Sequence, residues 1–197
     1  RLRAGITDGL PKLLAYELIN TALKPFPDAH LLCDEDEFED LMADLALHRL
    51  DVVLTDRPAP DNSNLKLFST RLGEFQTGWF APPKIAERFQ KNFPLSLKEA
   101  TLLLPSRHNV LRGKIDYWLE KQGIIPIIMG EFEDNALLNT FGRGGHGLFP
   151  APVALSEQIK TQLEAVFIGE MHGVSQEIYA LSSEKRIRHP IVETLCQ

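Results

Sequence analysis

With 197 residues, of which 44% are hydrophobic, the chain is long enough for one large soluble domain or for two small α/β lobes, each with its own core. No apolar run approaches the length that spans a membrane and the N-terminus lacks the pattern of a signal peptide, so we expect a cytoplasmic protein without membrane contact. The formal charge of -6 argues against a nucleic-acid-binding surface on this chain itself, because phosphate contacts need clustered lysine and arginine.

The chain opens with a predicted short strand over residues 2–6, a polar turn, and an apolar-periodic helix over residues 12–23. Thr7 or Asp8 is expected to cap this helix, because a side-chain oxygen at that position accepts from the free amides of the first turn. In an open α/β sheet such a turn lies at the carboxyl end of a strand, where ligands commonly bind. The opening turn is therefore the first candidate ligand site.

A second strand is predicted over residues 29–33, followed by the acidic run 34–37 and an amphipathic helix that begins at Phe38. We expect the acidic run to occupy the positive end of that helix, with a cation site as the alternative. Cys33 falls in an apolar strand, so we expect a small buried hydrophobe, with a reactive thiol as the alternative. We expect no structural disulfide with Cys196 in a reducing compartment.

Residues 51–56 form a continuous apolar run that ends in polar residues, which is typical of a parallel strand covered on both faces. By the right-handed crossover rule, the three strands that start near residues 2, 29 and 51 belong to one parallel sheet. Thr55 and Asp56 are then expected at the same edge of the sheet as the opening turn, with a loop over residues 57–62 beyond them.

From residue 65 to residue 82 the pattern changes to two long strands with no helix between them, which indicates a crossing into a second lobe. The elements expected after the crossing are helix 84–93, strand 101–104, helix 109–121 closed by Gly123, strand 124–130, helix 134–141, strand 147–153, a helix from Ser156 to about Phe167, strand 177–181, and a short helix from His189-Pro190 to Cys196.

Two motifs suggest nucleotide binding and a metal or catalytic site, but the residues around them do not support these functions. The glycine-rich run 142–147 follows a helix and enters a strand, whereas a dinucleotide fingerprint follows a strand and opens a helix, so we predict a helix cap and a tight turn. The six histidines show no paired ligand spacing, and Ser106-Arg107-His108 is not a catalytic triad by itself. We therefore predict that the chain is not an enzyme.

Ser106 ends a predicted strand just before a helix, as the opening turn does, so it begins a second candidate ligand turn. Oxygen-bearing side chains outnumber basic groups near the predicted strand ends, with solvated loop residues as the alternative interpretation. Asp8, Asp56 and Glu131 are the candidate ligands for a cation. The bare amides of the opening turn favour an anion instead, and the choice stays open.

The order and spacing of these elements resemble the effector-binding domain of LysR-type transcriptional regulators over essentially the whole chain. The segments that carry the resemblance are residues 2–11, 50–54, 103–123, Glu131 and 145–152. The resemblance implies a two-lobed, periplasmic-binding-protein-like (type II) α/β fold, each lobe a central mainly parallel sheet flanked by helices, joined by two crossing strands. It implies residues 1–74 plus 179–197 as lobe I and 75–178 as lobe II, with the N-terminal winged helix-turn-helix absent from this sequence.

Within that family the chain resembles the branch that activates a sodium/proton antiporter gene, through residues 72–74, 130–138, 141–142, 151–152 and 189–192. This implies a regulator that responds to sodium, lithium or another small ligand, without a resident cofactor. Family effectors sit between the lobes, so the ligand contacts implied for this sequence are Thr7, Asp8, Gly9, Thr55, Asp56, Ser106, Arg107, His108 and Glu131.

The resemblance also implies partners. It implies a homodimer or tetramer through the effector domain, in which helix 13–23 of one copy pairs with helix 110–119 of another in antiparallel fashion. Roughly half of the apolar residues on those helices are expected to be intramolecular core instead. DNA is expected to bind through the missing N-terminal domain. A solute-binding protein of a transporter shares this architecture and stays the alternative function.

Overall fold

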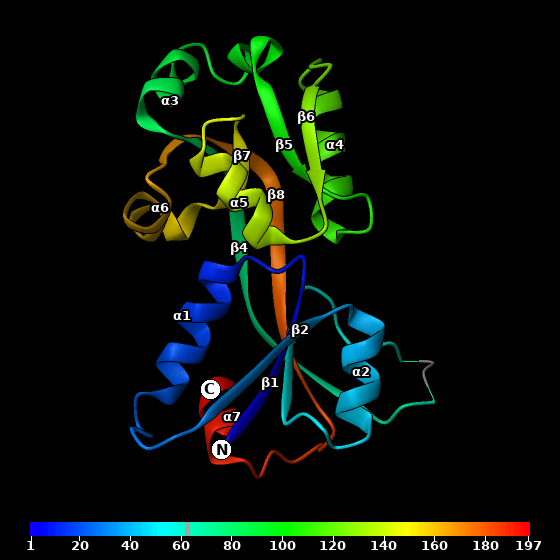
Figure 1. The fold of residues 1–197 in the computed structure, drawn as a ribbon. Coiled ribbons are helices and arrows are strands. Elements are labelled where there is room, and N and C mark those ends of the chain that lie inside the picture. Colours follow the sequence, from blue (N-terminus) through cyan, green and yellow to red (C-terminus); the bar gives the residue numbers. More distant parts are fainter. Residues whose placement is uncertain (62–63) are drawn as a thin grey trace. The chain divides into compact units, whose positions relative to one another are not determined.

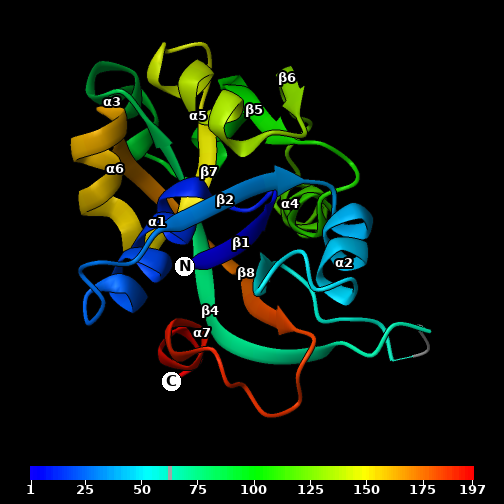
Figure 2. The same ribbon diagram turned by 60° about the horizontal axis from the view of Figure 1, so that its bottom comes forward.

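The computed structural model describes residues 1–61 and 64–197, and the chain divides into two compact units (Figures 1 and 2). Unit 1 comprises residues 1–74 and 177–197, and unit 2 comprises residues 75–176. Residue 62, the end of the predicted loop 57–62, lies outside the described residues.

Two long strands, β4 (Phe68–Ala81) and β8 (Val166–Ser182), carry the chain from one unit into the other and are neighbours in the sheet order. The prediction of two strands between residues 65 and 82 was wrong, because β4 is one continuous strand. The last predicted strand, 177–181, is the end of the 17-residue β8. Glycines at 169 and 173, the second with φ +83°, interrupt the alternation by which a strand is recognised in the sequence.

The sheet of unit 1 has the strand order β2 (Leu31–Asp36), β1 (Leu2–Thr7), β3 (Val52–Thr55), β8. The first three strands are parallel and β8 runs antiparallel to β3. All four residues of β3 are buried, as a strand covered on both faces requires. The parallel arrangement predicted for these three strands is confirmed.

Three helices cover this sheet. Figures 1 and 2 show α1 (Lys12–Leu23) and the short α7 (Pro190–Leu195) on one side and α2 (Phe38–Ala46) on the other. The apolar residues of α2 at three- and four-residue spacing are all buried in one cluster with β3 and Leu181, as the spacing predicted: Phe38, Leu41, Met42 and Leu45.

The predicted cap of α1 was wrong. The helix begins at Lys12 with Pro11 in the N-cap position and no side-chain cap, and a separate turn, in which Leu10 N donates to Thr7 O at 3.0 Å, stands between β1 and the helix. Neither Thr7 nor Asp8 therefore occupies the N-cap position of α1.

The prediction that the acidic run lies at the positive end of α2 holds only for Glu37, which is in the N-cap position of the helix without a side-chain cap. The strand β2 continues through Asp36, and all six of its residues are exposed because β2 forms one edge of the sheet. Cys33 is accordingly exposed rather than buried. Partial desolvation, followed by the carboxylates of Glu35 and Asp34, raises the pKa of its thiol, and a raised thiol pKa disfavours the reactive thiolate.

Unit 2 combines parallel and antiparallel strand pairs. The parallel pair is β5 (Thr101–Pro105) with β6 (Ile127–Phe132), and β4 pairs antiparallel with β7 (Phe149–Pro152). Leu148, just before β7, joins the two pairs, because its carbonyl accepts from Leu103 N at 2.8 Å and its amide donates to Thr101 O at 2.9 Å.

The helices of unit 2 are α3 (Pro83–Gln90), α4 (Val110–Lys121), α5 (Asn135–Arg143) and α6 (Ser156–Leu163), with 3-10 turns at Leu95–Glu99 and Val153–Leu155. The predicted end of α6 at Phe167 was wrong, since the left-handed Glu164 ends the helix. Ser156 does not cap it, because its hydroxyl donates to Val153 O at 2.6 Å. The glycine-rich run forms the predicted cap and turn, with Gly145 at φ +80°.

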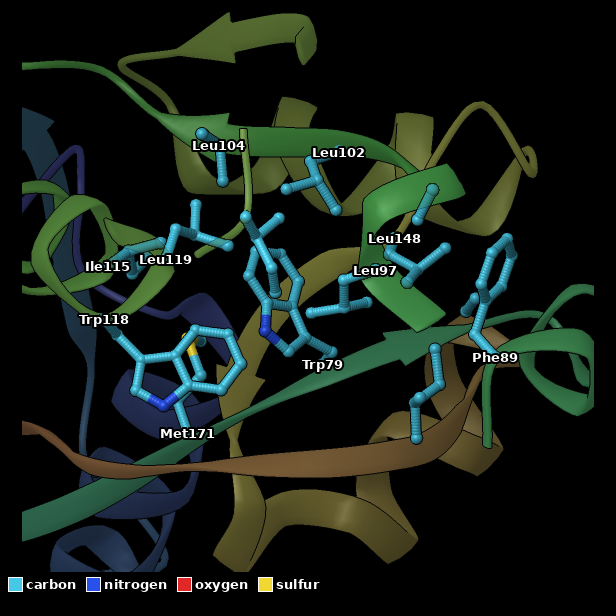
Figure 3. Packing of buried hydrophobic residues seen from close by; sticks show 14 of the residues in the cluster. Trp79, Phe89, Leu97, Leu102, Leu104, Ile115, Trp118, Leu119, Leu148 and Met171 are labelled. Atoms are coloured by element: carbon cyan, nitrogen blue, oxygen red, sulfur yellow. The ribbon is translucent and has the colours of Figure 1, made fainter. Parts of the chain in front are cut away.

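Figure 3 shows the core of unit 2, where Leu102 and Leu104 project from alternate positions of β5 toward Trp79 of β4. Trp118 and Leu119 of α4 close the same cluster. Both tryptophans of the chain lie in this core, so tryptophan fluorescence reports on unit 2 alone. Across the described residues, no helix has the length and apolarity needed to cross a bilayer.

Candidate functional site

The sheet of unit 1 brings five predicted ligand residues to one edge. We name Thr7, Asp8, Gly9, Thr55 and Asp56 the first cluster. Ile6 of β1 is in register with Leu54 of β3, and both strands run parallel, so the residues that follow them emerge side by side. The sequence predicted this juxtaposition because the carboxyl ends of neighbouring parallel strands share an edge.

Within the first cluster, Asp56 already has a cationic neighbour. Its side chain is only 5% exposed, and its Oδ1 atom lies 3.4 Å from Nε of Arg57. The Arg57 guanidinium in turn lies 4.6 Å from the centre of the Phe38 ring, so a cation-π contact holds it in place. Asp56 is therefore a partly neutralised carboxylate rather than an isolated negative charge.

The hydroxyl of Thr7 is a second notable group in this cluster. It is buried, and no hydrogen-bond partner for it is present among residues 1–61 and 64–197. A buried hydroxyl without a partner costs free energy, so such a group calls for an explanation. Thr55 contributes another buried hydroxyl, 3.5 Å from Asp56 Oδ1, which is at the limit of a hydrogen bond. These two hydroxyls add buried polar atoms to a cluster that also contains the carboxylate of Asp56.

Unit 2 brings together the remaining four predicted residues, Ser106, Arg107, His108 and Glu131, which we name the second cluster. Glu131 of β6 is in register with Leu104 of β5, and Ser106 N donates to Phe132 O at 2.8 Å. Arg107 and His108 are exposed in the turn that leads to α4. The second cluster is thus also a set of strand carboxyl ends.

Arg112 is a residue of this region that the sequence interpretation missed. Its side chain is 4% exposed, and its Nη1 atom donates to Pro105 O at 2.9 Å and lies 2.7 Å from Oε1 of Glu131. Its Nε donates to Asp116 at 2.9 Å. Burial alone would lower the pKa of Arg112, but the hydrogen bonds that it donates to Asp116 and Glu131 prevail and raise it. The guanidinium is permanently charged and ties β5, β6 and α4 together.

A signal for Arg112 was present in the sequence. The apolar face of helix 109–121 consists of Leu111, Ile115, Trp118 and Leu119, and Arg112 is the charged residue beside that face. A charged residue that helical geometry turns toward a core needs a carboxylate partner. The partner, Glu131, is supplied by a strand 19 residues further along, which periodicity alone does not reveal.

The three candidate cation ligands are divided between the two units. Asp8 and Asp56 belong to unit 1, Glu131 belongs to unit 2, and Glu131 is paired with Arg112. In the part of the chain that the structure describes, no three His, Cys, Asp or Glu residues are grouped so that they could hold a metal ion. A cation at either cluster would therefore rely on hydroxyl or backbone oxygens beside the carboxylates.

Comparison with known proteins gives a consistent result. The family model described as the LysR substrate binding domain matches residues 1–197. Two curated relatives, the transcriptional activator protein NhaR of Escherichia coli K12 and that of Shigella flexneri, are each 34% identical over 194 residues. The match covers 98% of this chain and 63% of each relative, so the chain spans less than two thirds of their length.

Solved structures share the fold. The reduced regulatory domain of OxyR2 from Vibrio vulnificus superposes with a TM-score of 0.71 at 16% identity, covering 99% of this chain and 92% of that one. The LysR family regulator CbnR gives a TM-score of 0.76 at 14% identity, covering 98% and 68%. These relatives are regulators by name, which gives no support to the transporter alternative. The chain belongs to the LysR substrate-binding domain family.

Proposed function

We propose that this chain is the effector-sensing domain of a LysR-family transcriptional activator that works in the cytoplasm and binds DNA through another part of the protein. The observation that carries the proposal is the 34% identity to an activator over 98% of the chain. A ligand that binds one conformation of the domain more tightly shifts the population toward that conformation. The shift is then passed to the DNA-binding part.

We further propose that each of the two clusters is a candidate effector site in its own unit. The first cluster supports a small cation, sodium or lithium, because Asp8 and Asp56 supply carboxylates and Thr7 supplies a buried hydroxyl without a partner among the described residues. The second cluster supports a carboxylate-bearing effector instead, because the positively charged Arg107 is exposed there. A titration with matched variants separates the two.

For the cation, we expect sodium and lithium chloride to raise the melting temperature of the purified chain saturably, while potassium chloride at the same ionic strength does not. A ligand at about 100 times its Kd stabilises by about 2.7 kcal/mol, which corresponds to a rise of roughly 5 to 10 °C for a chain of this size. The measurement is thermal unfolding with choline chloride as the ionic-strength balance. Asp8→Asn and Asp56→Asn are expected to weaken the response at least fivefold.

The matched control is Asp40→Asn, which makes the same change of carboxylate to amide in the first turn of α2. It is expected to respond like the unchanged chain. An equal response to potassium, or an equal loss in Asp40→Asn, would rule out the cation. In that event a saturable response to a panel of small carboxylates, abolished by Arg107→Gln, identifies the second type of effector.

The proposed function also includes self-association through an exposed apolar surface. Large apolar side chains are exposed on α1 and the edge strand β2 of unit 1 and on α4, on β6 and just before β6 in unit 2: Tyr16, Leu31, Leu32, Val110, Tyr117, Ile125, Ile127, Ile128 and Met129. Exposed apolar side chains on unpaired strand edges normally require a cover. We propose that a second copy covers them, with β2 and β6 joining the helices expected from the sequence. Other apolar residues of these helices, such as Leu14 and Ile115, are core.

We expect the chain to dimerise, and Leu32→Glu and Ile127→Glu each to weaken dimerisation at least tenfold, because each places a charge in an apolar contact. Sedimentation velocity over a concentration series up to about 100 µM measures the equilibrium. Leu47→Glu is the control, since Leu47 is 61% exposed at the end of α2, outside the proposed surface. A monomeric chain throughout the series, or equal effects of all three variants, would contradict the proposal.

A further inference from the structure

A pocket of about 390 Å³ lies wholly within unit 1, at the amino ends of β1 and β3, and therefore at the opposite end of these strands from the first cluster. Its walls come from the start of β1, the turn before β3, and the segment that runs from the end of β8 into α7. In Figures 1 and 2 this last segment, drawn orange to red, ends beside the N-terminus. None of the residues proposed for the effector lines this pocket.

The lining of the pocket combines polar residues with three apolar ones. Leu50 and Val192 are lining residues that belong to the buried core, and Ile187 is half-buried. An aliphatic group of a ligand would therefore lose contact with water on entering. The volume is sufficient for a ligand of several heavy atoms and lies within the usual range of small-molecule sites.

Two of the charged residues in the lining, Arg3 and Asp51, form an ion pair with each other. Asp51 accepts from the Arg3 amide at 2.8 Å and from Arg3 Nη2 at 3.0 Å. Burial alone would raise the pKa of Asp51, but the hydrogen bonds and charge of Arg3 prevail and lower it. Asp51 is thus an ionised carboxylate matched by a guanidinium, and the pair adds no net charge.

Both ring nitrogens of His189 also have hydrogen-bond partners. Its Nε2 lies 2.7 Å from Arg1 O, and its Nδ1 accepts from Ile191 N at 3.3 Å, so the imidazole caps α7 and secures the start of β1. This arrangement requires the neutral ring with the proton on Nε2. His189 therefore shapes the pocket without offering a free donor to it.

The other polar groups of the lining are mostly hydrogen-bond donors. Arg188 is exposed at the mouth, and within the described part of the chain no ion pair or hydrogen bond engages its guanidinium. His48 Nδ1 and the Ser183 hydroxyl lie 3.3 Å apart in the same lining and add two more polar groups. Glu184, exposed at the mouth, is the one carboxylate there that opposes an anion.

We propose that this pocket is a second ligand site, distinct from the effector site, which binds a small aliphatic carboxylate. The carboxylate group pairs with Arg188 and hydrogen-bonds to Ser183 or His48, and the aliphatic part packs on Leu50, Ile187 and Val192. Because the pocket is built partly from the segment that leads into α7 and from residues beside Arg1, its occupancy fixes the position of both ends of unit 1.

The test is isothermal titration of the purified 197-residue chain with the potassium salts of acetate, butyrate and hexanoate, with potassium chloride as the blank. We expect affinity to rise by about threefold to fourfold for each added methylene that is buried. Arg188→Gln is expected to weaken hexanoate binding about tenfold, because it removes the only full positive charge at the mouth that lacks an ion pair among the described residues.

Matched variants separate the proposal from its alternatives. Arg186→Gln removes an exposed charge two residues away and outside the lining, and Arg107→Gln changes the second cluster; both are expected to keep the affinity of the unchanged chain. Glu184→Gln is expected to strengthen binding twofold to threefold by removing a like charge. Affinity independent of chain length, equal losses in Arg188→Gln and Arg186→Gln, or tighter binding of hexylammonium that Glu184→Gln abolishes would each overturn the proposal.

Discussion

Replacing Gly142 by alanine is expected to lower the free energy of unfolding of unit 2 by about 1 to 3 kcal/mol, as for other overpacked cores. In an exposed helix the same substitution raises stability, because glycine is a poor helix former. At Gly142 of α5, however, an added Cβ would lie 2.3 Å from Cδ1 and 2.6 Å from Cε1 of Phe149. Phe149 is completely buried, so its ring has no free space into which it can move.

Gly113 is the matched control, because it also lies within a helix, α4, and an added Cβ there would meet nothing within 4 Å. Gly113→Ala is therefore expected to raise stability by roughly 0.5 to 1 kcal/mol. Urea unfolding followed by tryptophan fluorescence measures both changes, since Trp79 and Trp118 lie in the core of unit 2. Effects of the same sign in the two variants would show that the packing around Phe149 differs from this description.

Replacing Arg112 by methionine is expected to lower the stability of unit 2 by about 2 to 3 kcal/mol, which is slightly below the cost of breaking a fully buried pair because both partners are about half exposed. Methionine fills much of the volume of the arginine stem, so the loss comes from the charged group. Pro105 O would lose its donor at 2.9 Å, and Glu131 would lose the cation at 2.7 Å.

The control is Arg143→Met, which removes an exposed arginine whose guanidinium lies 3.2 Å from Glu164. Surface pairs of that kind contribute about 0 to 1 kcal/mol, so little change is expected. Asp116→Asn, which removes the half-exposed partner only, should fall between the two. If Arg112→Met proved as mild as Arg143→Met under the same fluorescence-monitored unfolding, the proposed tie between β5, β6 and α4 would be wrong.

Several elements follow from local sequence patterns. The parallel strands β1, β2 and β3 were predicted because apolar runs alternate with helical periods, and α2 was predicted because its apolar residues repeat at three and four positions. The glycine-rich turn after α5 was predicted from the backbone freedom that glycine provides. These features depend on neighbouring residues, so a single sequence carries them.

Other features depend on contacts between distant residues. The exposure of Cys33 follows from the edge position of β2, and edge position is a property of the assembled sheet. The continuity of β4 and β8 reflects pairing with strands far away in the sequence, which overrides the local breaks that glycines introduce. The Arg112 and Glu131 pair joins residues whose separate helical and strand patterns give no sign of each other.

The sequence by itself determined the family, the two-lobe architecture implied by that family, and the grouping of ligand candidates at strand ends, because these rest on element order and on the shared edge of parallel strands. Only the tertiary structure decided which of those candidates already have partners. It paired Asp56 with Arg57 and Glu131 with Arg112, left the Thr7 hydroxyl buried, and formed the pocket beside His189. Burial and ion pairing arise from residues that packing brings together, and a linear pattern contains no information on those distances.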